Sequence, residues 1–388
     1  MRIRLRIGPL AFMAQVGLVI ALALRGGVAQ ESNHGQSIDL RSKGYFDLPK
    51  DFKYLQFQMA NGQVSFLASD RVAVSFLANN KDIGLTDRER QSGGRWLFKT
   101  LVINVATGQL EKDWTWRTAT PDSQFVSLQN GQFLVSSDER VTVHQADGQT
   151  LSRLDLPMTN VFPARTYGTV VVSDSGSVLF VVSDKDKDTQ QVDTYRLPDL
   201  TVVTKFTIPY QSLVSRLSAS EEGLIYLSKT APYSLTLDHF GRDSNAVWAC
   251  QTPWQCGLHS RFIGANRLIL NDGMNTLVLV NDRGQLLQKH EFEKSEEIYG
   301  ASVCSDGARI MVKLLRMGGG STFLDVFPKA KAARIAILDA DTLQEVASLP
   351  FDPSNPVRAG IDPKGDLVGY LVNGMLKLWR IPAPTDAK

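Results

Sequence analysis

The chain has 388 residues, with 42 lysine and arginine residues against 40 acidic residues. Four of the basic residues, Arg2, Arg4, Arg6 and Arg25, lie in the first 29 residues, which contain no acid, so the rest of the chain is close to neutral. A nucleic-acid-binding protein is expected to carry a concentrated positive field, and this composition argues against that class.

The N-terminus has the features of a signal peptide. A basic start is followed by an uncharged apolar stretch from Pro9 to Leu24 and then by the small residues Gly27 and Ala29, spaced as signal peptidase requires. We expect cleavage after Ala29 and a periplasmic or secreted protein. The alternative is an uncleaved membrane anchor, because the stretch is only a little shorter than the roughly 20 residues that a span needs.

From residue 64 onward, a short apolar strand, a tight polar turn and a second apolar strand recur as a unit. Glycine-containing turns between β-branched runs predict hairpins. The turn residues Gly131, Gly176, Gly223, Asn266, Gly307 and Gly365 are separated by 45, 47, 43, 41 and 58 residues. This period is typical of the blades of a propeller. The predicted hairpins span residues 64–77, 125–136, 169–182, 217–227, 261–270, 300–312 and 359–371.

A second pair of strands follows each of the first six hairpins, in residues 100–116, 140–157, 192–209, 234–251, 276–293 and 334–352. The seventh unit stops after a third strand at 375–382, whereas the segment 37–49 precedes the first unit without a hairpin partner. We therefore predict an all-β, seven-bladed β-propeller of four-stranded blades, closed by an N-terminal strand that completes the last blade. Closure removes the exposed sheet edge. The alternative is six blades with a terminal extension.

The predicted domain organisation follows from these patterns. Residues 1–29 form the signal peptide, 30–36 a short linker, 37–382 a single propeller domain, and 383–388 a C-terminal tail. No segment after the signal peptide has the helical period over a length that would form a stable helix.

The three cysteines have different expected roles. Cys250 and Cys256 flank a short segment containing Pro253, and in an oxidising compartment we expect them to form a disulfide. The bond would close a short loop and contribute roughly 2 kcal/mol. Cys304 is expected to be a small apolar residue on an inner strand, with a reactive thiol as the alternative.

The segment Leu376-Lys377-Leu378-Trp379-Arg380 resembles the end of the third strand of WD40 blades, with Arg380 where aspartate is expected. The chain as a whole, over residues 37–382, resembles the WD40/YVTN-type propellers and is similar to exported bacterial propellers without an assigned activity. The Gly-His dipeptide of WD40 blades is missing, so the resemblance does not imply that family's Asp–His network. Residues 104–108, with Trp114 and Trp116, look like the docking turn of quinoprotein propellers. Because this turn occurs once, no pyrroloquinoline quinone site is expected.

The loops between second and third strands predict a binding face. They are long in unit one, at 78–95, and in unit six, at 316–333, and of moderate length in unit three, at 183–191. In a four-stranded blade these loops lie on the same face as the links between blades. Insertions on one face of a repeat protein usually mark its binding face. The alternative is that they are tolerated surface excursions.

Cations are expected to gather on this face. The candidate ligand-binding residues are Arg95, Arg165, Arg216, Arg261, Arg316 and Arg358. A ring of arginines at the mouth of the central channel would favour a carboxylate, a phosphate or an acidic glycan. The alternative is that these arginines pair with acids such as Glu221, Glu296 and Asp352.

The sequence contains no recognisable catalytic motif. Asp184, Asp186 and Asp188 alternate as in calcium loops, but lysines lie between them and no bidentate glutamate follows. We expect no metal and no cofactor, and a monomeric binding or scaffold protein whose partner is a protein, a glycan or a small anion. The alternative is a hydrolase- or lactonase-like enzyme with a metal or an anionic substrate at the channel mouth, because propeller enzymes assemble sites from many blades.

Overall fold

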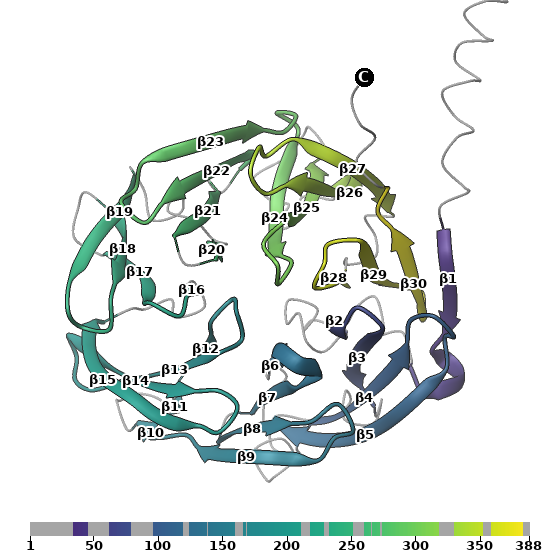
Figure 1. The fold of residues 1–388 in the computed structure, drawn as a ribbon, viewed down its shortest axis with the longest axis horizontal. Helices are drawn as coiled ribbons and strands as arrows, with labels where there is room; N and C mark the ends of the chain where they lie inside the picture. The colour runs from purple at the N-terminus through teal and green to yellow at the C-terminus, as the bar shows by residue number, and fades with distance from the viewer. Residues whose placement is uncertain are drawn as a thin grey trace, which may run out of the picture.

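The computed structural model describes residues 34–45, 62–78, 96–118, 124–137, 139–159, 166–167, 169–210, 218–228, 233–250, 260–264, 266–271, 274–317, 330–351 and 358–382. Regular structure in these ranges is β-strand, apart from two short 3-10 helices, η1 (Arg41–Lys43) and η4 (Gln129–Gly131). None of the helices there is long and apolar enough to cross a membrane. Seven four-stranded antiparallel sheets are arranged in a ring (Figure 1), which confirms the predicted seven-bladed propeller.

The strands of the first four blades follow the chain from the inside of the ring outward. Blade one consists of β2 (Gln63–Ala68), β3 (Arg71–Leu77), β4 (Trp96–Asn104) and β5 (Leu110–Thr118). Blade two consists of β6 (Gln124–Ser127), β7 (Phe133–Ser137), β8 (Arg140–His144) and β9 (Thr150–Asp155). Blade three consists of β12 (Thr169–Val172), β13 (Val178–Asp184), β14 (Thr189–Arg196) and β15 (Thr201–Pro209). Blade four consists of β16 (Ser218–Ala219), β17 (Leu224–Ser228), β18 (Tyr233–Asp238) and β19 (Ser244–Cys250).

The last three blades continue the same order. Blade five consists of β20 (Arg261–Ile263), β21 (Arg267–Asn271), β22 (Thr276–Asn281) and β23 (Leu286–Glu291). Blade six consists of β24 (Glu296–Val303), β25 (Arg309–Met317), β26 (Ala330–Asp339) and β27 (Glu345–Phe351). Blade seven consists of β28 (Arg358–Ile361), β29 (Leu367–Val372), β30 (Met375–Arg380) and β1 (His34–Asp39).

The ring is closed by the N-terminal strand. β1 pairs antiparallel with β30, with Ile38 opposite Leu376. Leu40 directly follows β1, is fully buried, and donates its backbone N–H to the carbonyl oxygen of Gly374 at 2.9 Å. The predicted closure is therefore confirmed. The strand begins at residue 34, three residues before the domain start predicted at residue 37.

In several blades, the turn between the third and fourth strands is closed by the same type of side-chain hydrogen bond. Oδ1 of Asn104 accepts hydrogen bonds from the backbone amides of Ala106 and Thr107, both at 3.0 Å. Oδ1 of Asp339 accepts equivalent bonds from the amides two and three residues on. These Asx side chains close the turn, as is common for Asn and Asp. In all six hairpins of this kind the strand register then shifts at a bulge, which increases the local twist.

The core consists of seven apolar clusters, one at each interface between neighbouring blades. A middle strand of a blade is covered on both faces, so it reads as a nearly continuous apolar run, as β3 does with the sequence RVAVSFL. Phe133 and Phe180, both fully buried, lie on such second strands of blades two and three. Because each sheet buries both faces against its neighbours, the ring is held together by packing between blades rather than by a single central core.

Several loops differ from the sequence prediction. β25 extends to Met317 and β26 begins at Ala330, so parts of the predicted insertion 316–333 are strand. Arg316 and Met317 pair with Ala332 and Ala330 across the hairpin, and Arg316 also pairs with Glu296 of β24. In blade three only residues 185–188 separate the second and third strands, and Asp186 closes that turn by accepting the amides of Asp188 and Thr189. A two-stranded sheet of β10 (Met158–Thr159) and β11 (Thr166–Tyr167) was not predicted. Residues 79–95 and 318–329 lie outside the described residues.

Candidate functional site

The first strand of each blade lies nearest the axis of the ring (Figure 1). Arg261 begins β20 and Arg358 begins β28, so both lie where a link between blades meets an innermost strand, as predicted. Arg95, Arg165 and Arg216 lie outside the described residues.

Arg316 was predicted to lie in a loop, but it lies on a strand and forms an ion pair with an acid. It lies on β25 opposite Glu296 of β24, and its guanidinium forms an ion pair with Glu293. The guanidinium of Arg358 donates a hydrogen bond to the hydroxyl of Tyr45 at 3.0 Å, which ties blade seven to the N-terminal segment. The structure therefore gives both of these predicted ligand-binding arginines contacts within the fold.

Arg334, a cation on β26 of blade six, is bound by two acids. Its guanidinium donates to both carboxylate oxygens of Glu296 at 2.7 and 3.0 Å and to both oxygens of Glu345 at 2.7 and 2.8 Å. The side chain of Glu296 is only 4% exposed, and the hydrogen bonds from Arg334 hold its pKa below the ordinary value. The alternative interpretation, that cations of this face pair with neighbouring acids, holds for Arg334.

Lys313, on the second strand of blade six, is a cation that the sequence analysis did not identify. It lies in the middle of β25, opposite Gly300 of β24. Its Cδ is 3.9 Å from the position that a Cβ on Gly300 would occupy, so the side chain extends inward over the innermost strand. Arg261 of blade five is close enough to repel it. Among the described residues, no carboxylate forms an ion pair with either cation.

The environment of Lys313 disfavours its charged form. Burial, with a smaller contribution from Arg261, lowers the pKa of Lys313 from 10.5 to about 8, which corresponds to a cost of about 3 kcal/mol for the folded, charged state. Tyr299, at the bulge of β24 beside Gly300, is 44% exposed and places a hydroxyl on the same innermost strand. Burying an uncompensated charge is unfavourable, and an anion bound near Lys313 and Arg261 would offset this cost. The signal in the sequence was one lysine inside the apolar run 310–315.

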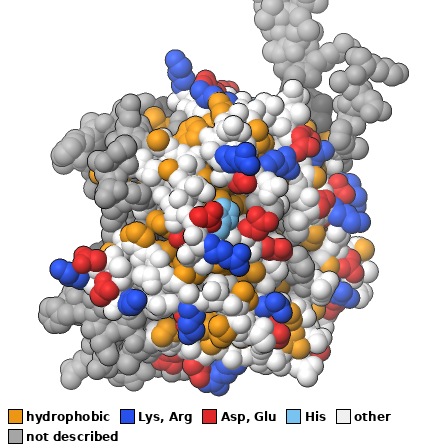
Figure 2. Space-filling model, turned by 60° about the vertical axis from the view of Figure 1, so that its left-hand side comes forward, with side chains coloured by type: hydrophobic (Ala, Val, Ile, Leu, Met, Phe, Trp, Pro, Cys, Tyr) orange, Lys and Arg blue, Asp and Glu red, His pale blue; other side chains and the backbone are white. Residues whose placement is uncertain are grey.

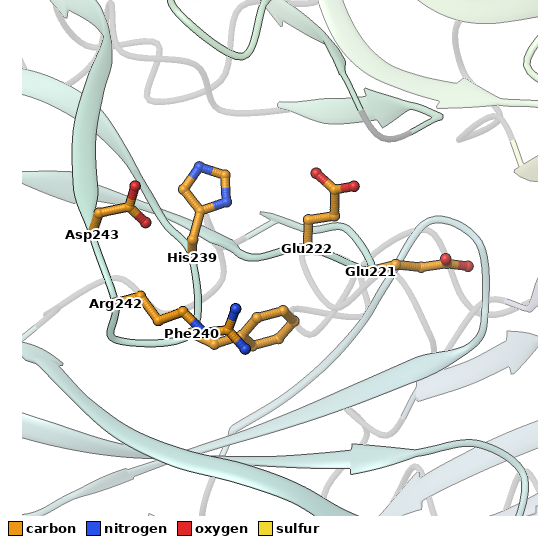
Figure 3. A pocket seen from close by; sticks show the side chains of 6 residues that line it. All are labelled: Glu221, Glu222, His239, Phe240, Arg242 and Asp243. Atoms are coloured by element: carbon orange, nitrogen blue, oxygen red, sulfur yellow. The ribbon is translucent and has the colours of Figure 1, made fainter.

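A shallow depression of about 680 Å³ lies at the opposite end of blade four. Its lining residues come from the turn between β16 and β17 and the turn between β18 and β19: Glu221, Glu222, His239, Phe240, Arg242 and Asp243. Figure 3 shows the side chains of His239, Glu222 and Asp243 pointing to one side of the ribbon and Arg242 pointing away from them. The turns that join the first strand of a blade to the second, and the third to the fourth, lie on the face opposite to the predicted insertion face. This hollow is therefore an acidic feature of the other face.

The described surface carries charges of both signs. Figure 2 shows lysine, arginine, aspartate and glutamate side chains interspersed over the side of the ring that it displays. Among the described residues, no group of three or more His, Cys, Asp or Glu side chains is arranged to hold a metal ion. Within the described ranges, Lys313 of blade six and Arg261 of blade five are neighbouring cations that form no ion pair with an acid.

Cys304 is a buried thiol with local hydrogen bonds. Its Sγ donates to Oδ1 of Asp306 at 2.8 Å and accepts the backbone amide of Arg309 at 3.0 Å. Burial and the bond to Asp306 raise the pKa of Cys304 to about 12, so the reactive thiolate does not form at neutral pH. A structural role fits this thiol. The side chain of Cys250 and all of Cys256 lie outside the described residues, and their disulfide stays a prediction.

Comparisons with known proteins address the fold. No protein-family model and no curated protein matches the chain. Among solved structures 933 chains resemble it, including a chain of "Crystal Structure of Mitotic Checkpoint Complex", with a TM-score of 0.52 over 92% of this chain and 97% of that chain. The sequence identity is 11%, and a likeness at that level concerns the fold alone. The chain has the fold of a seven-bladed β-propeller.

Proposed function

We propose that this propeller is a non-catalytic binding module whose ligand carries a negative charge and binds at the centre of the ring. The observation that supports this proposal is the pair of cations Lys313 and Arg261, which come from different blades and have no acidic partner among the described residues. Arg261 lies at the end of β20 that meets the link between blades. The ligand therefore enters from the face on which the insertions were predicted.

The chemistry near Lys313 favours binding over hydrolysis. A metal-dependent lactonase or hydrolase needs several converging carboxylate or histidine ligands, and the described residues provide no such group. The two cations Lys313 and Arg261 instead provide donors for a carboxylate or a phosphate. A small anion, or an acidic group of a larger partner, fits this arrangement.

Export of the protein is part of the proposal. The basic start, the apolar stretch and the small residues before Gln30 support cleavage after Ala29. N-terminal sequencing of the protein purified from a periplasmic fraction should begin at Gln30. Mass spectrometry without reducing agent should detect a Cys250–Cys256 disulfide in the same sample.

Calorimetric titration with inorganic phosphate and with citrate tests the binding site. We expect Lys313→Met and Arg261→Gln each to weaken binding by about tenfold or more, because each removes a charge-assisted contact. Lys112→Met is the matched control, because Lys112 is exposed on the outer strand β5, and it should bind as the wild type does.

Two results would contradict the proposed function. If the wild type binds neither probe, or if Lys313→Met and Arg261→Gln bind as the Lys112→Met control does, the anion site is wrong. If the wild type hydrolyses simple lactones or phosphate esters and Lys313→Met abolishes the activity, the site is catalytic and the enzyme alternative is correct.

A further inference from the structure

A second recess lies between blades one and two, away from the axis of the ring. Its volume is about 370 Å³. Trp114 and Trp116 of β5 line one side, and Arg140, Thr142 and His144 of β8 line the other. Because the two tryptophans are two residues apart on one strand, they lie on the same face of the sheet. We call this recess the tryptophan groove.

Comparison with blade three shows that the fold itself does not require an open groove here. Phe206 and Ile208 of β15 occupy the same places relative to the bulge as Trp114 and Trp116 of β5. They are buried against the next blade, with 8% and 1% of their surfaces exposed. The tryptophans are larger and yet only half-buried, because the facing strands of blade two carry small side chains such as Ser137.

The walls of the groove are held rigidly. The ring of Trp114 stacks on Phe133 with centroids 4.8 Å apart, and that of Trp116 stacks on Phe98 at 4.7 Å. Both phenylalanines are fully buried. The indole N–H of Trp116 donates to the hydroxyl of Thr100 at 3.0 Å. Fixed aromatic surfaces lower the entropic cost of binding a flat ligand.

The polar groups of the groove do not favour a charged ligand. Nε of Arg140 donates to Asp155 at 3.1 Å, which balances its charge and leaves its terminal N–H groups for a ligand. His144 is hydrogen-bonded to Thr142 at 2.8 Å, and burial lowers its pKa, so the imidazole is neutral at pH 7. No described residue accepts a hydrogen bond from the indole N–H of Trp114. The groove therefore combines apolar faces with hydrogen-bonding groups around them.

We propose that the tryptophan groove binds a neutral sugar ring, such as one hexose of a glycan. A pyranose has a flat face of C–H groups, which packs on an indole, and a rim of hydroxyls, which hydrogen-bonds to groups such as Arg140. This combination matches a site with aromatic walls and a few polar contacts. An extended peptide fits less well, because the indole N–H of Trp116, a donor that a peptide carbonyl would need, is already bound to Thr100. The site is separate from the anion site at the axis.

The test uses the full mature chain and three neutral probes: cellotriose, maltotriose and N-acetylchitotriose. Binding is measured by calorimetry and by the change in tryptophan fluorescence. We expect at least one probe to bind, and Trp114→Leu and Trp116→Leu each to weaken it by about tenfold, because each removes one stacking surface. Trp248→Leu is the matched control, because Trp248 lies half-buried on the fourth strand of blade four.

A second variant separates loss of binding from loss of folding. Arg140 is a strand-end residue whose charged group lies at the surface, so Arg140→Gln should fold normally and weaken binding by about fivefold, as expected for one lost hydrogen bond. Lys313→Met should leave sugar binding unchanged. The proposal is overturned if none of the three probes binds the wild type. It is also overturned if the Trp114, Trp116 and Arg140 variants bind like the wild type, or if a proline-rich peptide binds the groove more tightly than the sugars.

Discussion

Replacing Lys313 by methionine is expected to stabilise the fold while it weakens anion binding. Burial, together with the nearby charge of Arg261, lowers the pKa of this lysine from 10.5 to about 8. The decrease corresponds to a cost of about 3 kcal/mol when the lysine is charged in the folded state. Methionine has a similar length and no charge, so Lys313→Met should increase the free energy of unfolding by up to about 3 kcal/mol near neutral pH.

The pH dependence of this effect has a defined sign. Between about pH 8 and pH 10.5 the unfolded chain binds the proton of Lys313 more tightly than the folded chain does, so the stability of the wild type rises with pH in that window. Below about pH 8 the full cost is present, and above about pH 10.5 lysine is neutral in both states. The difference between Lys313→Met and the wild type should therefore be constant at neutral pH and shrink at alkaline pH.

Urea unfolding followed by tryptophan fluorescence at several pH values measures this difference. Lys112→Met, at an exposed position on β5, serves as the control and should change stability by less than about 0.5 kcal/mol. A Lys313→Met variant that is less stable than the wild type at neutral pH, or whose advantage persists unchanged above pH 10.5, would refute the reasoning. Phosphate should stabilise the wild type more than the variant, by about 1.4 kcal/mol for each tenfold difference in affinity.

Three further predictions concern the fold. Leu40→Ala should lower the free energy of unfolding by about 3 kcal/mol, because Leu40 is fully buried at the closure of the ring. The control is Leu151→Ala, on an outer strand and 39% exposed. If urea unfolding gives both variants the same stability, the closure is contradicted. Gly284→Ala should cost about 1–3 kcal/mol more than Gly264→Ala. Both glycines have positive φ, but a Cβ at Gly284 would collide with the backbone carbonyl of Val247 in blade four, whereas nothing lies within 4 Å of a Cβ at Gly264. Equal thermal midpoints of the two variants would argue against this contact. Burial lowers the pKa of His144, so its contribution to stability is present above about pH 6.5 and is lost as the pH falls through the pKa of the folded state. His144→Gln should therefore make the loss of stability on the acid side less steep. An unchanged slope of stability against pH would exclude this role.

Much of the architecture could be predicted from the sequence because its signals are local. Turn residues such as Gly176 and Gly307 adopt the positive φ that a tight hairpin needs, and alternating or continuous apolar runs report how many faces of a strand are buried. The unpaired strands at both ends of the repeat series predicted the closure between β1 and β30. Each of these signals involves residues within one hairpin, or a terminal strand that has no hairpin partner in the repeat series.

The sites depend on contacts that the sequence pattern does not report. Lys313 is placed near Arg261, 52 positions away in the chain, only because Gly300 leaves room for its side chain and two blades meet there. Arg316 was predicted to lie in a loop, and instead the longer β25 places it beside Glu293.

Strand order, hairpins and ring closure were therefore determined by the sequence alone, because the period of the apolar pattern and the chemistry of the turns act between near neighbours. The tertiary structure decided which cations are neutralised and where the tryptophans of β5 remain partly exposed. Both outcomes depend on which side chains the next blade presents across the interface, and that pairing exists only after the blades have packed against each other.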